Sequence, residues 1–209
     1  GMMPEFIFNE TGLVNEVEGF YPKTPKLVYF KGEEDPTKIF QDSIELEKEL
    51  KEKWGERGRI NDFRNDENKV IKFIKKLYKQ AITPTVEIAY EELGKEIADL
   101  WVFGTAKNLL DHYFTSEKSK LYMGMTVIES GPASIYDPGT AFTIPLMDSG
   151  SVFDGYWGFV KTGIWKITET LSNINLDLGV KIYLNSSVTE VDTKSKIISF
   201  IKDNKDTEL

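Results

Sequence analysis

The chain has 209 residues, a net charge of −8 and 40% hydrophobic residues, so it is long and apolar enough to bury a core. The excess of acidic residues argues against general nucleic-acid binding, because that function needs a basic face to neutralise phosphates. The chain has no cysteine, which excludes disulfides, thiol chemistry and cysteine-ligated metals within it. A single histidine, His112, excludes a histidine-rich metal cluster.

Two local features could still carry a function. His112 lies in a helical run with apolar neighbours, which favours a partly buried packing role over catalysis. A basic cluster on a predicted helix falls mainly on the side away from the apolar stripe of that helix. That placement favours a solvated face over a phosphate-binding one. The cluster consists of Lys69, Lys72, Lys75, Lys76 and Lys79.

The apolar runs and the beginning of the chain bear on its location. No apolar run reaches the roughly 18–20 residues that cross a bilayer. Met2-Met3-Pro4-Glu5 lacks the basic region and apolar core of a signal peptide. Gly1 before Met2 suggests a scar of tag removal, so we expect the natural reading frame to begin at Met2 or Met3. The sequence therefore predicts a cytoplasmic protein without a transmembrane segment.

Short strands are expected near the beginning of the chain. Residues 5–9 and 26–30 are β-prone runs separated by turns, and they are expected to pair in a small sheet. Residues 31–36 form a turn, and Pro36 suits the start of a helix. Apolar spacing predicts that helix over 37–54, and the glycines of 55–58 end it.

Helices are expected to dominate the middle of the chain. An apolar stripe from Ile60 to Tyr78 predicts a long helix that Asn61 or Asp62 would cap. Two further helices are expected over 86–104 and 105–113. Another is expected from Ser116 to just before Gly131, with Leu121, Met125 and Ile128 as its apolar positions.

Strands return toward the C-terminus. Residues 132–155 are rich in Pro, Gly, Asp and Ser and are expected to form loops, followed by a strand over 156–160. A helix is expected over 163–178, and strands at 180–184, 188–191 and 197–202. The pattern predicts an α+β fold, related to α/β folds. It has a helical region with a small mixed or antiparallel sheet, then a helix and strands.

Ionisable residues form no recognisable catalytic motif. Neither Gly-x-Gly-x-x-Gly nor a P-loop occurs, so the usual backbone cradle for a dinucleotide pyrophosphate is absent from these 209 residues. No Gly-x-Ser-x-Gly turn supplies a nucleophilic serine. The unusual concentration over 136–165 is aromatic, interleaved with glycines. Such a segment lines an apolar pocket or forms the packed side of a sheet, and the sequence leaves both readings open.

From about Ala98 to Lys202 the chain resembles phytoene-desaturase-like and carotenoid-oxidoreductase-like FAD enzymes of the amine-oxidase superfamily. The segments that carry the resemblance occur in order along the chain. They are a helix ending at Phe114, Asp137-Pro138-Gly139-Thr140-Ala141-Phe142, Gly155-Tyr156-Trp157-Gly158-Phe159-Val160, the helix from Gly163, and Leu178 to Val191.

The resemblance implies an FAD domain that is split in sequence and carries an inserted substrate domain. On that map residues 5–160 are a substrate-binding-like domain and 161–204 part of an FAD domain, unless both pack as one domain. Val188 would contact the adenine end of the flavin through its backbone. Trp157 and Phe159 would face the substrate cavity, and Phe142 is a third candidate for the substrate pocket.

The chain departs from this family pattern in three places. Thr162-Gly163 stands where the family has two adjacent glycines, and a Cβ at the first position restricts positive φ. The N-terminal dinucleotide motif and the C-terminal segment over the flavin ring are both missing. We therefore expect that this chain alone neither binds FAD nor catalyses. If Met2 is a native start, the short reading frame is itself natural.

Three hypotheses follow. The first is a split or fragment subunit that contributes the substrate-binding region, completed by a companion polypeptide with the dinucleotide-binding motif. The second is a stand-alone binding module for an apolar small molecule or a protein partner. The third is an inactive remnant. Unpaired strand edges are also expected to favour a homo-oligomer. The substrate is not determined by the sequence.

Overall fold

A computed structural model describes residues 3–129, 131, 133–150, 152–153, 157–202 and 205–208. The chain divides into two compact units, Gly1–Ile164 and Trp165–Leu209. The first unit is rich in helices and the second contains one helix and a small sheet. Both carry antiparallel pairing, which confirms the α+β prediction.

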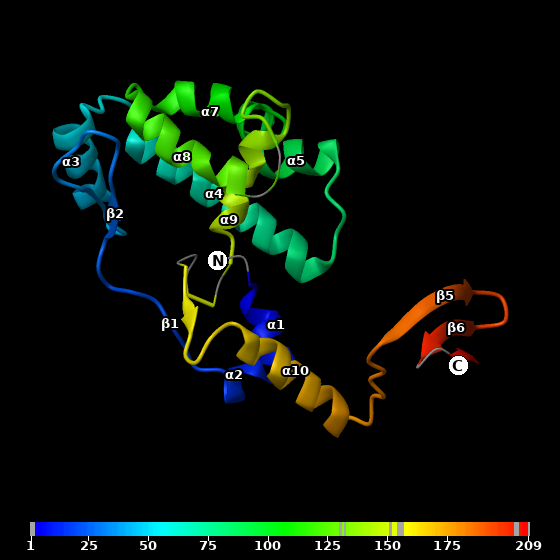
Figure 1. Cartoon of the computed structure of the whole chain (residues 1–209). Helices are drawn as coiled ribbons and strands as arrows, with labels where there is room; N and C mark the ends of the chain where they lie inside the picture. Colours follow the sequence, from blue (N-terminus) through cyan, green and yellow to red (C-terminus); the bar gives the residue numbers. More distant parts are fainter. Residues whose placement is uncertain are drawn as a thin grey trace. The chain divides into compact units, whose positions relative to one another are not determined.

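Four helices enclose the main core of the first unit: α3 (Ser43–Trp54), α4 (Ile60–Gln80), α7 (Ala106–Tyr113) and α8 (Glu117–Glu129). Helix α4 packs against α3 and α7, and α8 packs against α7 and α3 (Figure 1). The predicted stripe along α4 explains this arrangement, because Ile60, Phe63 and Val70 are all buried against the neighbouring helices.

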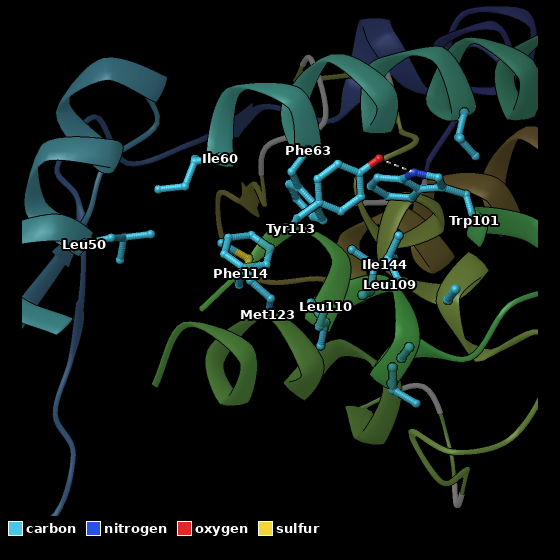
Figure 2. Packing of buried hydrophobic residues seen from close by; sticks show 14 of the residues in the cluster. Leu50, Ile60, Phe63, Trp101, Leu109, Leu110, Tyr113, Phe114, Met123 and Ile144 are labelled. Carbon is cyan, nitrogen blue, oxygen red and sulfur yellow. Dashed lines mark hydrogen bonds between the residues drawn. The ribbon is translucent and has the colours of Figure 1, made fainter. Parts of the chain in front are cut away.

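Aromatic rings fill the centre of this core. The ring of Phe63 lies 5.0 Å from that of Trp101 and 4.9 Å from that of Phe114, measured between centroids. The indole N–H of Trp101 donates a 3.1 Å hydrogen bond to the Tyr113 hydroxyl, which satisfies a buried donor (Figure 2). Apolar area buried in this way stabilises the fold by roughly 25 cal/mol per Å².

Shorter elements complete the first unit. The chain begins with α1 (Glu5–Glu10) and α2 (Leu13–Glu16). Between α4 and α7 lie α5 (Val86–Leu93), α6 (Lys95–Ile97) and the π-helical turn η1 (Ala98–Val102). After α8 come the 3₁₀ turn η2 (Thr140–Phe142) and α9 (Thr143–Met147).

Two small antiparallel sheets belong to the first unit. Strand β2 (Lys26–Val28) pairs with β3 (Thr37–Ile39), with Leu27 opposite Lys38. Strand β1 (Gly19–Phe20) pairs with β4 (Phe159–Val160), which brings together residues about 140 positions apart in the sequence. The pairing of β1 and β4 is extended by a backbone bond from Lys161 N to Glu18 O at 2.9 Å.

The second unit consists of α10 (Trp165–Asp177) and a meander of β5 (Ser186–Asp192), β6 (Ile197–Lys202) and β7 (Lys205–Glu208). The strand order is β5-β6-β7, so β6 is central. The β5–β6 hairpin confirms the strands predicted at 188–191 and 197–202. Its turn is stabilised by Asp192, whose carboxylate accepts from Lys194 N at 2.8 Å.

Two predicted elements, and the beginning of a third, are wrong in kind. Residues 5–9 form helix α1 instead of a strand, so residues 26–28 pair with β3 and not with them. The helix predicted over 37–54 begins later, because residues 37–39 form strand β3. Helix α3 starts at Ser43, where the Asp42 carboxylate accepts hydrogen bonds from Ile44 N and Glu45 N. Residues 180–184 form no strand, and their side chains are exposed.

Other corrections concern boundaries and faces. The helix expected over 86–104 breaks at Gly94, whose φ of 77° is left-handed. Part of the expected 132–155 loop is helical, in η2 and α9. Arg59, not Asn61 or Asp62, occupies the N-cap position of α4. Along α8 the buried positions are Ser119, Met123, Gly124 and Val127, whereas Leu121, Met125 and Ile128 are exposed.

Candidate functional site

An exposed group of aromatic side chains surrounds the β1–β4 pair. Phe20 on β1 lies opposite Phe159 on β4, and their rings stack with centroids 5.9 Å apart. Both side chains are more than half exposed, at 53% and 56%. We call Phe20, Tyr21, Phe153, Trp157 and Phe159 the aromatic platform. Exposed apolar surface of this kind marks binding sites more often than isolated exposed residues do.

Two glycines allow the platform to close around Phe153. A Cβ added at Gly158 would lie 2.1 Å from the Phe153 ring, and one added at Gly19 would lie 2.5 Å from it. The ring therefore lies directly against the backbone of both strands. Tyr21 extends the surface, with its ring 5.9 Å from that of Phe153. This close packing explains Gly158, one of the glycines interleaved with aromatics over 136–165.

Trp157 adds the largest exposed ring of the platform. Its side chain is 46% exposed, and the Lys26 ammonium lies 5.9 Å from the ring centroid, within the range of a cation–π contact. No member of the platform is a carboxylate, histidine or lysine. The platform can therefore hold an apolar, flat or elongated ligand, and the Tyr21 hydroxyl is its one group capable of proton transfer.

The structure separates the four residues predicted for a site. Trp157 and Phe159 both belong to the platform. Phe142 lies in η2 and packs against the main helical core rather than against the platform. Val188 lies in β5 of the second unit, opposite Phe200, with an exposed side chain. Gly155 and Tyr156, also part of the family-like motif, lie outside the described residues.

Sequence reasoning missed Phe20, Tyr21 and the position of Phe153. The signal for Phe20 and Tyr21 was weak, because a two-residue strand next to Pro22 has no periodicity to detect. Only the pairing of β1 with β4 brings these rings to Phe159. That pairing joins the two ends of the first unit and cannot be found from local pattern.

A polar cavity of about 340 Å³ lies beside α4 and α7. Within it the Tyr113 hydroxyl donates to the Asp66 carboxylate at 2.7 Å, and Lys69 Nζ lies 2.7 Å from the same carboxylate. Burial raises the pKa of Tyr113, assisted by the negative charge of Asp66. Burial also opposes ionisation of Asp66, but hydrogen bonds from Lys69 and Tyr113 leave its pKa lowered. These groups thus satisfy one another.

His112 lines the same cavity, but its side chain is exposed rather than partly buried. Its ring meets the Tyr113 ring edge-on, with centroids 4.7 Å apart. The partly buried packing role predicted for His112 is therefore wrong, because the residue lies on the outer side of α7. Neither His112 nor any other residue lining this cavity belongs to the aromatic platform.

A second group of charged side chains, of which Glu67 is buried, lies where α4 packs against α9. Arg64 Nη1 lies 2.6 Å from the Glu67 carboxylate, which is almost fully buried. Burial raises the pKa of Glu67, an effect that the Arg64 charge opposes. Burial likewise raises the pKa of Asp148, beside the same arginine. The arginine pairs directly with Glu67 on the same helix, and its charge also favours ionisation of Asp148 at the end of α9.

The described residues contain no group of three or more His, Asp or Glu side chains placed to hold a metal ion. They also contain no helix that is long and apolar enough to cross a membrane. Thr162, where the resembled family has glycine, adopts a φ of 76°. A β-branched residue in this left-handed region is strained. The backbone thus keeps a glycine-like turn despite the substitution.

The described residues therefore define a helix-rich α+β chain with an exposed aromatic platform. Among curated proteins, the chain is similar to 4,4'-diapophytoene desaturase (4,4'-diaponeurosporene-forming) of Staphylococcus aureus strains Newman, USA300 and COL. Identity is 29% over 111 residues, which cover 52% of this chain and 21% of each relative. No family model and no solved structure matches.

The similarity supports a distant relationship to carotenoid desaturases. The chain spans about a fifth of the length of the curated relatives it matches. The relationship therefore concerns one part of such an enzyme, and the activity of the whole relative does not transfer with it.

Proposed function

We propose that this chain contributes the substrate-binding region of an FAD-dependent oxidoreductase of the carotenoid-desaturase kind and is not catalytic alone. Three observations support the proposal: the 29% identity to diapophytoene desaturases, the family-like segments between Ala98 and Lys202, and the aromatic platform. The platform carries the argument, because it gives the proposed role a physical surface within the first unit.

The substrate class follows from the chemistry of the platform. Stacked and tilted aromatic rings offer dispersion contacts to a long, flat hydrocarbon and make no demand for polar groups on it. An elongated isoprenoid has this character. Within such an enzyme the role of Phe20, Trp157 and Phe159 would be to bind and orient the chain of the substrate and to exclude water from it.

The residues of this chain do not fit a complete flavin site. Val188, the position implied by resemblance, offers one backbone contact, and one edge of its strand is already paired with β6. No Gly-x-Gly-x-x-Gly cradle occurs in the 209 residues. FAD supplies two-electron oxidation when bound, and it would be held mainly by protein outside this chain.

The proposal predicts that Trp157→Ala weakens binding of an apolar polyene. Loss of an exposed aromatic contact of this size should raise the dissociation constant of retinol by about tenfold. Retinol fluorescence in the presence of the purified chain would measure the constant. Tyr136→Ala is the matched control, because Tyr136 is an exposed aromatic in the same unit with no part in the platform.

Unchanged affinity in Trp157→Ala would show that the platform is not the binding surface. An equal loss in Tyr136→Ala would show that the probe adheres to exposed rings in general. Either result would contradict the proposed role of the platform in substrate binding.

A further inference from the structure

A second cavity lies where α4 meets α5, away from the aromatic platform. Its volume is about 280 Å³. Three of the five clustered lysines, Lys69, Lys72 and Lys76, line it from α4. The sequence pattern favours a solvated face for this cluster, and these three side chains are exposed, but they also line one common cavity. We call this the lysine cavity; its other lining residues are Phe73, Glu92 and Leu93.

Charge within the lysine cavity is only partly neutralised. Lys69 pairs with Asp66 at 2.7 Å, and Lys76 forms a close ion pair with Glu92. Lys72 forms no ion pair among the residues that the structure describes. The lining thus holds three ammonium groups and one carboxylate, in a chain whose overall charge is −8. Like charges one turn apart on a helix, such as Lys72 and Lys76, repel each other, and a bound anion would relieve that repulsion.

Apolar side chains form the base of the lysine cavity. Phe73 is buried and packs with Leu93 in the small core between α4 and α5. A free inorganic anion would gain nothing from these two side chains. A molecule that joins an anionic group to an apolar group would use both the ammonium groups and the apolar base.

We propose that the lysine cavity binds a small amphiphilic anion, in which a phosphate group is attached to an apolar chain or ring. Phosphate suits the site because several ammonium groups can surround its oxygens as point charges. Lys72 supplies the free charge, while Lys69 and Lys76 exchange part of their present pairing for the ligand. This site shares no residue with the aromatic platform, and it stands or falls independently of the proposed desaturase-related function.

Titration of the full chain by calorimetry tests the proposal with four probes: octyl phosphate, inorganic phosphate, octanol and phosphatidylglycerol vesicles. We expect octyl phosphate to bind at one saturable site at least about tenfold more tightly than inorganic phosphate, because it uses the apolar base as well. Octanol should not compete for the site. Affinity should fall as salt is raised, because exposed charges are screened.

Variants locate the site. Lys72→Gln removes the unpaired ammonium group and should weaken octyl phosphate binding by about tenfold. Lys48→Gln is the matched control, because Lys48 is an exposed lysine on α3 for which the structure gives no ion pair. Leu93→Ala should weaken octyl phosphate but leave the weak affinity for inorganic phosphate unchanged.

The proposal is overturned if Lys72→Gln binds octyl phosphate like the unaltered chain, or if Lys48→Gln loses as much affinity. Equal affinity for inorganic and octyl phosphate would overturn its amphiphilic part. Binding to phosphatidylglycerol vesicles without binding of octyl phosphate would assign the lysines to a lipid surface instead and would equally overturn it.

Discussion

At the scale of single residues, Glu56 is a buried carboxylate that joins two turns of the first unit through hydrogen bonds. Its carboxylate is fully buried and accepts hydrogen bonds from Gly58 N at 2.7 Å and Thr115 N at 2.8 Å, and from Ser116 N at 3.1 Å. It thereby ties the turn between α3 and α4 to the turn between α7 and α8. Gly58 permits the approach, because a Cβ there would lie 2.0 Å from Tyr113 O.

These hydrogen bonds make the free energy of unfolding depend on pH. Burial alone would raise the pKa of Glu56, but hydrogen bonds from Thr115 and Gly58 outweigh it and lower the pKa from 4.5 to about 2. A carboxyl whose pKa is lower in the folded chain stabilises it fully above pH 4.5, and the contribution is lost as the pH falls toward 2. At neutral pH it amounts to about 3 kcal/mol.

We predict that Glu56→Gln lowers the free energy of unfolding at pH 7 by about 3 kcal/mol, since an amide cannot accept from so many donors. The difference from the unaltered chain should shrink between pH 4.5 and pH 2. Urea denaturation at a series of pH values would measure it. Glu52→Gln, at an exposed position on α3, should leave the curve unchanged. A difference that stays constant with pH would contradict this account.

No local pattern predicts the role of Glu56, because two of its partners, Thr115 and Ser116, lie 59 and 60 residues away in the chain. The sequence shows only an acid between two glycines in a helix-breaking turn. Trp157 and Phe159 were predictable as site candidates because aromatic concentration is visible in one segment. Phe20 was not, because its role depends on the pairing of β1 with β4.

At the scale of elements, long periodic helices were predictable and short elements were not. Helix α4 follows from its stripe, since burial of one face decides the structure of such a segment. In α1, β-prone residues after Pro4 form a six-residue helix closed by a bond from Thr11 Oγ1 to Ile7 O. The hydrogen bonds that close this short helix outweigh the β-propensity of its residues, because that propensity stabilises a strand only beside a partner strand.

The packing of β1 and β4 can be tested through Gly158. A methyl group at this position would lie 2.1 Å from the Phe153 ring, so Gly158→Ala must displace the ring. We predict a loss of about 1–3 kcal/mol in unfolding free energy, typical of overpacking. In the Phe153→Ala background the same substitution should cost almost nothing, because the ring is gone. A double-mutant cycle measures this coupling, and simple additivity of the two changes would contradict it.

At the scale of the whole molecule, the two units differ in how much apolar surface they bury. The first unit has an extensive core that α3, α4, α7 and α8 share. In the described part of the second unit only Thr170 and Phe200 are buried, whereas Val188, Val191 and Leu184 are exposed. β5 is also an edge strand with one paired neighbour among the described strands. An exposed edge with apolar side chains is a template for further pairing.

We predict that the second unit binds a polypeptide that carries the dinucleotide-binding motif of a flavin enzyme. Expression with the segment that carries Gly-x-Gly-x-x-Gly, whether encoded in the same reading frame or a neighbouring one, should yield a yellow complex with flavin absorption. Val188→Lys with Val191→Lys should abolish the complex, because charged lysines on the exposed edge strand oppose burial against a partner. Ile44→Lys, at an exposed apolar position on α3 in the other unit, should not affect it.

The absorption spectrum and co-purification of the two polypeptides give independent readouts of this prediction. A colourless complex would show association without a flavin site, and the proposed oxidoreductase role would then be wrong although the second unit has a partner. Absence of any association would contradict the prediction that β5 binds a partner polypeptide. A yellow complex that persists in the double lysine variant would place the contact elsewhere, because two buried lysines at the interface would each cost several kcal/mol.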